Sequence, residues 1–136
     1  MYNKILIPVD MTHTERAPEM IEAAKKLAGE HAGFVLANIV HSVPAVAEMA
    51  LPKDIFEMSY EEARKKLAIV AKDAGIEAII EIKPGHPAAD ILEIAKEQNI
   101  DLIIIGSHKP GFQDYLLGST AARVVRHAQC PVLVMR

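Results

Sequence analysis

The sequence has little cysteine, few aromatic residues and no long apolar run. A single cysteine, Cys130, excludes an intramolecular disulfide and suits a reducing compartment. The absence of tryptophan, with three Phe and three Tyr, leaves few rings for stacking on single-stranded bases. The formal net charge of −3 provides no basic footprint for a phosphate backbone. These absences argue against a disulfide-stabilised secreted domain and against a nucleic-acid-binding protein.

The most apolar window, residues 34–51, is not predicted to be a membrane span. Asn38, Pro44 and Glu48 are among the residues that interrupt it, well short of the ~20 apolar residues that a span needs. The opening stretch MYNKILIPVD has too short an apolar run for a signal peptide. We therefore expect a cytoplasmic protein.

The chain of 136 residues has the length of one domain, 1–136, and contains neither an internal repeat nor a linker. Short apolar runs alternate with helical patterns along it, which predicts an α/β fold with a doubly wound parallel sheet of five strands. Periodicity predicts helices over 15–31, 54–74 and 87–98, and a last one marked by Ala121, Val124, Val125 and Ala128. The predicted strands are 4–9, 33–40, 77–82, 101–105 and 131–135.

Two strand orders are common for such a sheet, 3-2-1-4-5 and 2-1-3-4-5, and we predict the first. In that order the chain direction around the sheet reverses between the first and fourth strands. A crevice then opens at their carboxyl ends, where ligands bind in this architecture. The first strand ends at Pro8-Val9-Asp10 and the fourth at Ile105-Gly106.

The stretch GSHKPGFQDYLLGST, residues 106–120, leaves this crevice as a polar loop with three glycines. Gly118-Ser119-Thr120 leads into the last helix, whose first N–H groups and positive dipole end favour an anion. Lys109 adds a charge, and His108 could donate to a phosphate. The stretch is neither a Walker loop nor a G-x-G-x-x-G fingerprint. From spacing alone it is either a phosphate site or a turn in which Ser119 is only the helix N-cap.

The same stretch resembles the nucleotide loop of the universal stress protein family, whose ATP-binding members carry G-x2-G-x9-G-S/T after the fourth strand. The resemblance covers the whole chain: KILIPVD resembles the family's opening, HPAADILEIAKEQNIDLIIIGSH its third helix and fourth strand, and LLGSTAARVVRHAQCPVLVMR its ending. Lys109 replaces the second motif glycine, and the interval to Gly118 is one residue short. In this form the loop is similar to the short-loop subgroup of enterobacterial F- and G-type members.

The resemblance implies that the protein binds ATP, with Mg²⁺ as a counter-ion of the phosphates, and functions as a regulatory dimer in the stress response. It places adenine against Val40 and near Asp10, whose alternative role is a turn residue that caps the next segment. The nucleotide-binding residues that we expect are Pro8, Val9, Asp10, Val40, Ile105, Gly106, Ser107, His108, Lys109, Gly118, Ser119 and Thr120.

Enzymatic chemistry finds little support in the sequence. No G-x-S-x-G elbow is present, strand three ends in Lys83-Pro84 rather than an aspartate, and the six histidines form no helix-spaced ligand pair. We expect no catalytic residues and no dedicated metal site, with slow ATP hydrolysis left open. The alternative function is a stress-response dimer that binds no nucleotide and works through protein contacts.

The last strand, CPVLVMR, would form an apolar edge of the sheet, and such an edge needs a partner. Members of the family pair this strand with its two-fold mate, so the resemblance implies a homodimer through residues 131–135. A tetramer is the larger alternative, and the sequence does not identify a protein partner.

Overall fold

The computed structural model describes residues 1–41, 53–107 and 117–136, with the backbone alone at 41 and 53–58. Its strands are β1 (Tyr2–Pro8), β2 (Ala28–His41), β3 (Ala78–Gly85), β4 (Leu102–Gly106) and β5 (Val132–Met135). A 3-10 helix, η1 (Met11–Arg16), precedes α1 (Ala17–Leu27), and the other helices are α3 (Lys53–Asp73), α4 (Pro87–Glu97) and α5 (Ser119–His127).

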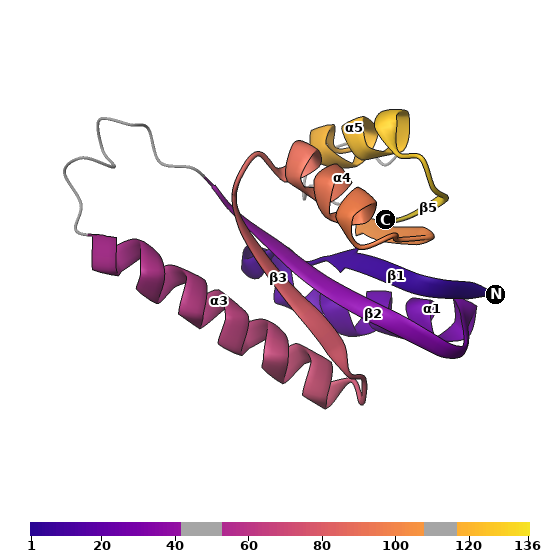
Figure 1. Cartoon of the computed structure of the whole chain (residues 1–136), viewed down its shortest axis with the longest axis horizontal. Coiled ribbons are helices and arrows are strands. Elements are labelled where there is room, and N and C mark those ends of the chain that lie inside the picture. The colour runs from indigo at the N-terminus through magenta and orange to yellow at the C-terminus, as the bar shows by residue number, and fades with distance from the viewer. Residues whose placement is uncertain (42–52, 108–116) are drawn as a thin grey trace.

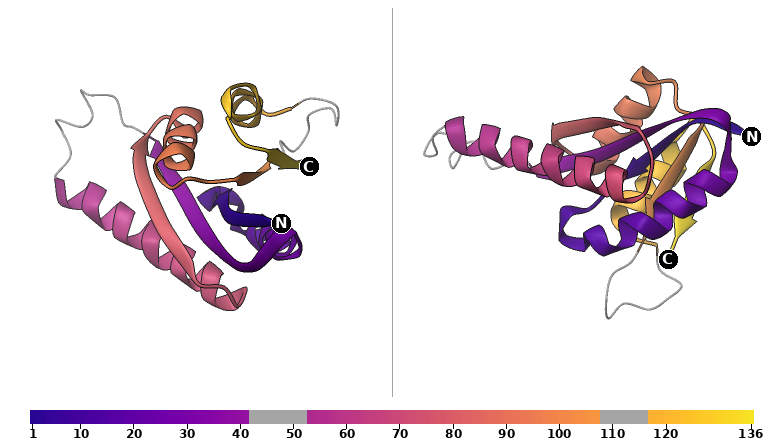
Figure 2. Two further views of the ribbon diagram at one scale, coloured as in Figure 1. Left: turned by 45° about the vertical axis from the view of Figure 1, so that its right-hand side comes forward. Right: turned by 90° about the horizontal axis from the view of Figure 1, so that it is seen from below.

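The five strands form one parallel sheet in the order β3-β2-β1-β4-β5, which confirms the predicted α/β architecture. Helices cover both faces of the sheet (Figures 1 and 2), with α1 and α3 on one face and α4 and α5 on the other. β1 is hydrogen-bonded to β2 on one side and to β4 on the other. The predicted reversal of chain direction therefore occurs between β1 and β4.

Alternating residues of the central strands supply two apolar cores. Ile5, Ile7 and Leu36 pack with α1 and α3, whereas Leu6, Val35 and Ala37 pack with α4 and α5. All six side chains are completely buried. This two-sided burial explains why the central strands read as continuous apolar runs.

One predicted boundary is wrong. The helical spacing extends from residue 15 to His31, but α1 ends at Leu27 and His31 lies in β2. Ala28 is already extended, with ψ of 143°, and pairs with Tyr2 at the start of β1. Gly29 and Gly33 follow, and glycine is a poor helix former, so strand pairing satisfies the backbone here at less cost than helix continuation.

The other predicted elements are present, with ends that differ by a few residues. β3 continues to Gly85, three residues beyond the prediction, because it pairs with β2 along its whole length. Within the described part of the chain, no helix is long and apolar enough to cross a membrane.

Candidate functional site

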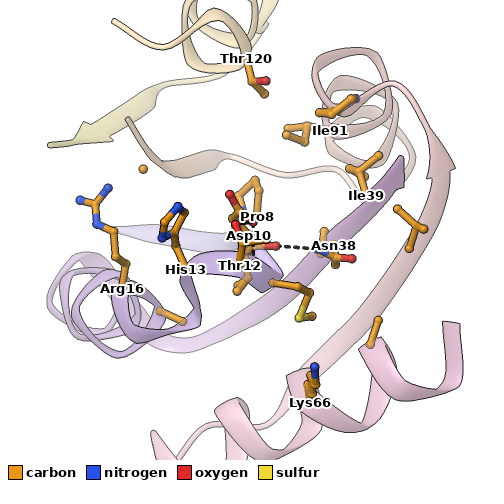
Figure 3. A pocket seen from close by; sticks show the side chains of 18 of the residues that line it. Pro8, Asp10, Thr12, His13, Arg16, Asn38, Ile39, Lys66, Ile91 and Thr120 are labelled. Carbon is orange, nitrogen blue, oxygen red and sulfur yellow. Dashed lines mark hydrogen bonds between the residues drawn. The ribbon is translucent and has the colours of Figure 1, made fainter. Parts of the chain in front are cut away.

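A cavity of about 550 Å³ opens at the carboxyl ends of β1, β2 and β4. Its walls come from segments that are distant in sequence: the turn after β1, the end of β2, the inner side of α3, the start of α4 and the start of α5. Figure 3 shows this convergence, with Pro8 and Asp10 at the centre, Thr120 and Ile91 on one side and Lys66 on the other. The cavity lies at the β1/β4 reversal, where the strand order predicted it.

The structure brings most of the described candidate residues to this cavity. Its lining includes Pro8, Val9, Asp10, Val40, Ile105, Gly106 and Thr120. Ser107 and Ser119 are adjacent in sequence to lining residues, and Gly118 is two positions from Thr120, but none of the three is part of the lining. His108 and Lys109 lie outside the described residues.

Asp10 is exposed at the centre of the site, directly after β1. Its Oδ1 accepts hydrogen bonds from the backbone N–H of Thr12, at 2.9 Å, and from the Thr12 hydroxyl, at 2.7 Å. Asp10 therefore caps η1, which confirms the capping role considered from the sequence. Its Oδ2 makes no hydrogen bond among the described residues, so this oxygen remains available to a donor in the cavity.

The amino end of α5 forms another wall. Gly118 is its N-cap, with φ of −59° and ψ of 152°, and provides no side-chain cap. The alternative in which Ser119 caps the helix is therefore wrong, because Ser119 is the first helical residue and is exposed. Thr120, one residue further, lines the cavity. The first turn of α5 thus borders the cavity, and the amino end of a helix favours an anion.

Gly106 and Gly118, the described glycines of the predicted phosphate loop, do not owe their identity to a left-handed backbone. Among the described glycines, only Gly75 and Gly85 have a positive φ. A Cβ on Gly118 would lie 3.4 Å from Ser107 Oγ, an ordinary contact. A Cβ on Gly106 would lie 3.1 Å from Arg16 Nη1, which is crowded. The glycine at position 106 thus leaves space beside Arg16 and is not required by φ.

The lining contains polar residues that were not predicted from the sequence: Thr12, His13, Arg16, Asn38, Ser59, Glu62 and Lys66. Two of them, Asn38 and Arg16, donate to backbone carbonyl groups that are distant in sequence. Asn38 is 8% exposed, and its Nδ2 donates to the carbonyl oxygen of Val9 at 2.8 Å. Because that carbonyl can only accept, the bond fixes the orientation of the amide. The available signal was a polar residue at an inward position of the apolar stretch FVLANIV. Arg16 is the second such residue, and only its sequence proximity to Asp10 could have indicated it.

Charges near the turn after β1 are partly balanced. His13 Nδ1 lies 3.3 Å from Glu15 Oε1. A backbone N–H and, to a smaller extent, His13 lower the pKa of the exposed Glu15 carboxyl. Within residues 1–41, 53–107 and 117–136, no group of three or more His, Cys, Asp or Glu residues is arranged to hold a metal ion.

Comparison with known proteins identifies the family. The model of the universal stress protein family matches residues 1–136. The chain belongs to the universal stress protein family. Universal stress protein MJ0531 of Methanocaldococcus jannaschii is 34% identical over all of this chain and 83% of its own length. Universal stress protein G of Escherichia coli O157:H7 is 31% identical over the full length of both chains.

Solved structures of other proteins share the fold. The hypothetical protein MJ0577 superposes with a TM-score of 0.79 at 31% identity, over 99% of this chain and 96% of the other. The universal stress protein of Archaeoglobus fulgidus solved in complex with dAMP gives a TM-score of 0.69 at 21% identity, over 99% and 98% of the two chains. The family and the Rossmann-like α/β fold that the sequence predicted are both confirmed.

Proposed function

We propose that this universal stress protein binds ATP in the cavity at the β1/β4 reversal and acts as a nucleotide-occupied sensor in the stress response. The observation that carries the proposal is the combination of features around one cavity. Apolar strand ends, an Asp10 carboxylate oxygen with no partner among the described residues and the amino end of α5 all converge there. An adenine nucleoside needs an apolar wall and a hydroxyl acceptor, and its phosphates need amide donors.

In this arrangement the base lies against Val40, with Pro8 and Val9 along the same edge. Asp10 Oδ2 accepts from ribose or from the base, and Ile105 lies under the nucleoside. The phosphates extend past Gly106 and Ser107 toward Gly118, Ser119 and Thr120. The resemblance adds His108 and Lys109 to the phosphate end, with Mg²⁺ bound through the phosphates.

The fold of a universal stress protein accommodates an adenine nucleotide, since the Archaeoglobus fulgidus protein was solved with dAMP. We infer that the present protein binds rather than transforms its ligand. Binding becomes a signal only if the free and occupied states differ in their affinity for a further protein. The single cysteine, which suits a reducing compartment, supports a cytoplasmic site of action.

We further propose a homodimer through residues 131–135. β5 is an edge strand of the sheet, and each residue from Val132 to Met135 is only partly buried within one chain. An antiparallel pairing with a second copy would cover this apolar edge. Sedimentation at micromolar concentration should give the mass of a dimer or of a tetramer built from two dimers, and a monomer would contradict the proposal.

The nucleotide proposal is tested by calorimetric titration with Mg-ATP, after extraction of any co-purified nucleotide. Gly118→Val adds methyl groups beside the amides that would receive the phosphates and should abolish micromolar binding. Gly118→Ala adds only a Cβ in ordinary contact with Ser107 and should retain most of the affinity.

The matched control is Gly33→Val at the opposite end of the sheet, where a Cβ would meet only Lys4 Cγ at 3.8 Å. This variant should bind ATP like the unmodified protein. If the unmodified protein produces no heat of binding, the proposal is wrong, and the alternative of a dimer that works through protein contacts is favoured.

A further inference from the structure

Arg16 extends from the end of η1 toward the end of β4, beside His13 (Figure 3). The residue is half-buried and lines the cavity. Its Nη2 donates to the carbonyl oxygen of Met135 at 3.3 Å. The same carbonyl accepts a 2.7 Å hydrogen bond from the backbone N–H of Ser107, so the guanidinium is positioned at the start of the predicted phosphate loop.

The charge of Arg16 has no carboxylate partner among the described residues. The ion pairs found there join His13 to Glu15, Lys25 to Glu22, Arg64 to Glu61 and Lys83 to Glu97. A guanidinium carries five N–H donors and remains protonated at all physiological pH values. One long hydrogen bond to a neutral carbonyl leaves most of those donors for a ligand.

Gly106 makes room for this side chain. A Cβ at that position would lie 3.1 Å from Arg16 Nη1 and 3.6 Å from its Cζ. Because Gly106 does not have a positive φ, backbone conformation gives no reason for a glycine there. The space that the glycine leaves is occupied by a cationic group that faces the cavity.

We propose that Arg16 binds the phosphate groups of the nucleotide and makes the site selective for anionic nucleotides over uncharged nucleosides. The inference rests on the proposed function, because it assigns the charge selectivity of the same cavity. A planar guanidinium binds phosphate through paired, charge-assisted hydrogen bonds. Arg16 approaches the cavity from the α1 side of the sheet, so it supplements the amides of α5 on the other side.

A purely structural role is the competing explanation, in which Arg16 only ties η1 to β5 through the Met135 carbonyl. The two explanations predict different ligand profiles. Loss of a phosphate contact weakens binding of ATP and AMP but spares adenosine. Loss of a structural tie weakens all three ligands together and lowers thermal stability.

The experiment compares dissociation constants for Mg-ATP, AMP and adenosine in the unmodified protein, Arg16→Gln and Arg16→Lys. Arg16→Gln should weaken ATP binding by about ten- to hundredfold, the range for a hydrogen bond to a charged group, and leave adenosine within about twofold. Arg16→Lys retains the positive charge but lacks the paired donors of a guanidinium. Its affinity for ATP should lie between those of the unmodified protein and Arg16→Gln. Arg64→Gln is the matched control, because Arg64 is exposed on α3 and pairs with Glu61.

Gly106→Ala supplies a second, independent test. The added Cβ should displace the guanidinium and reduce ATP affinity, but it should have no further effect in the Arg16→Gln background if it acts through Arg16. If the two substitutions reduce ATP affinity additively, Gly106 acts on the ligand directly and not through Arg16.

The outcomes separate the two proposals. If the unmodified protein binds ATP and Arg16→Gln leaves the ratio of ATP to adenosine affinity unchanged, the role of Arg16 is structural and the proposed function stands. If the unmodified protein binds neither ATP nor adenosine, both proposals are wrong. If Arg16→Gln does not fold, Arg16→Lys is the deciding variant. An unchanged ratio of ATP to adenosine affinity in Arg16→Lys, together with ATP binding that does not depend on salt concentration, would overturn the inference.

Discussion

The Oγ atom of Ser107 accepts a 2.8 Å hydrogen bond from the backbone N–H of Gly118, eleven positions later in the chain. Ser107 is 9% exposed, and its own N–H donates to the Met135 carbonyl. The bond joins the end of β4 to the start of α5, the two elements between which the predicted phosphate loop lies. It fixes where the first amides of α5 point.

Ser107→Ala should therefore lower the free energy of unfolding by about 1–3 kcal/mol, because it leaves the Gly118 N–H without its acceptor in a partly buried place. Urea denaturation of the purified protein measures this change. Ser119→Ala also removes a serine hydroxyl, but from an exposed position, and should lower the free energy of unfolding by less than about 0.5 kcal/mol. Equal effects of the two substitutions would show that the Ser107 bond contributes nothing specific.

The bond between Asn38 and Val9 gives a second prediction. Asn38→Leu fills a similar volume but leaves the buried Val9 carbonyl without a donor, which should cost about 1–3 kcal/mol. Asn38→Asp should be more destabilising at neutral pH, because a carboxylate would face the carbonyl oxygen.

The pH dependence of the two Asn38 variants distinguishes this explanation from a packing effect. The folded state of Asn38→Asp favours the protonated carboxyl, which can donate to Val9, so stability should be recovered as the pH falls and lost as it rises. The deficit of Asn38→Leu should not depend on pH in this way. If both variants show the same pH profile in urea denaturation, the hydrogen bond does not explain the burial of Asn38.

The two-sided covering of the sheet could be predicted from local pattern, and the position of the cavity follows once the order 3-2-1-4-5 is chosen over 2-1-3-4-5. Short apolar runs such as LIII, residues 102–105, can be buried only between two layers of helices, and the order 3-2-1-4-5 then places a crevice beside Pro8 and Ile105. The boundary at Leu27 could not be predicted in the same way. Apolar spacing continues to His31, and the pairing of Ala28 with Tyr2 decides the outcome.

Arg16 and Asn38 escaped prediction for a related reason. The partner of Arg16 is a carbonyl 119 positions away, and the partner of Asn38 is 29 positions away. Neither contact leaves a periodic or motif-like trace in the sequence, since each depends on the juxtaposition of strand ends. A polar side chain within or beside an apolar strand nevertheless indicates such a contact, because burial requires that it find a partner.

Asp101 anchors the start of β1. Its two carboxylate oxygens accept hydrogen bonds of 2.8 Å from the backbone N–H groups of Asn3 and Lys4, and its own N–H donates to the Lys4 carbonyl. Asp101→Ala should lower the free energy of unfolding by about 2 kcal/mol, as expected when charge-assisted bonds to backbone amides are lost. Thermal or urea denaturation measures the change.

Asp73→Ala is the control for this substitution, because Asp73 is exposed at the end of α3 and its side chain makes no hydrogen bond or ion pair with another described residue. It should change stability by less than about 0.5 kcal/mol. Hydrogen exchange adds a local measurement: the amides of Asn3 and Lys4 should lose protection in Asp101→Ala and keep it in Asp73→Ala. Unchanged protection of these two amides would contradict the anchoring role.

Burial, and next to it the negative charge of Asp101, raises the pKa of the Cys130 thiol. The thiol therefore stays protonated at pH values where an exposed cysteine has begun to ionise, and the thiolate is the reactive form. Iodoacetamide should alkylate the folded protein more slowly than a small model thiol at about pH 8. Asp101→Asn removes the neighbouring charge and should accelerate the reaction.

The raised pKa of Cys130 also has a consequence for stability. A proton held more tightly in the folded state favours folding in full below the pKa of the unfolded thiol, and this contribution is lost as the pH rises through the folded pKa. The stability of the unmodified protein should thus fall more steeply than that of Cys130→Ser between about pH 8 and pH 10. Both proteins contain the same tyrosine and lysine residues, so the titration of these residues cancels in the comparison. A steeper fall in Cys130→Ser, or alkylation faster than that of the model thiol, would mean that the folded protein favours the thiolate instead.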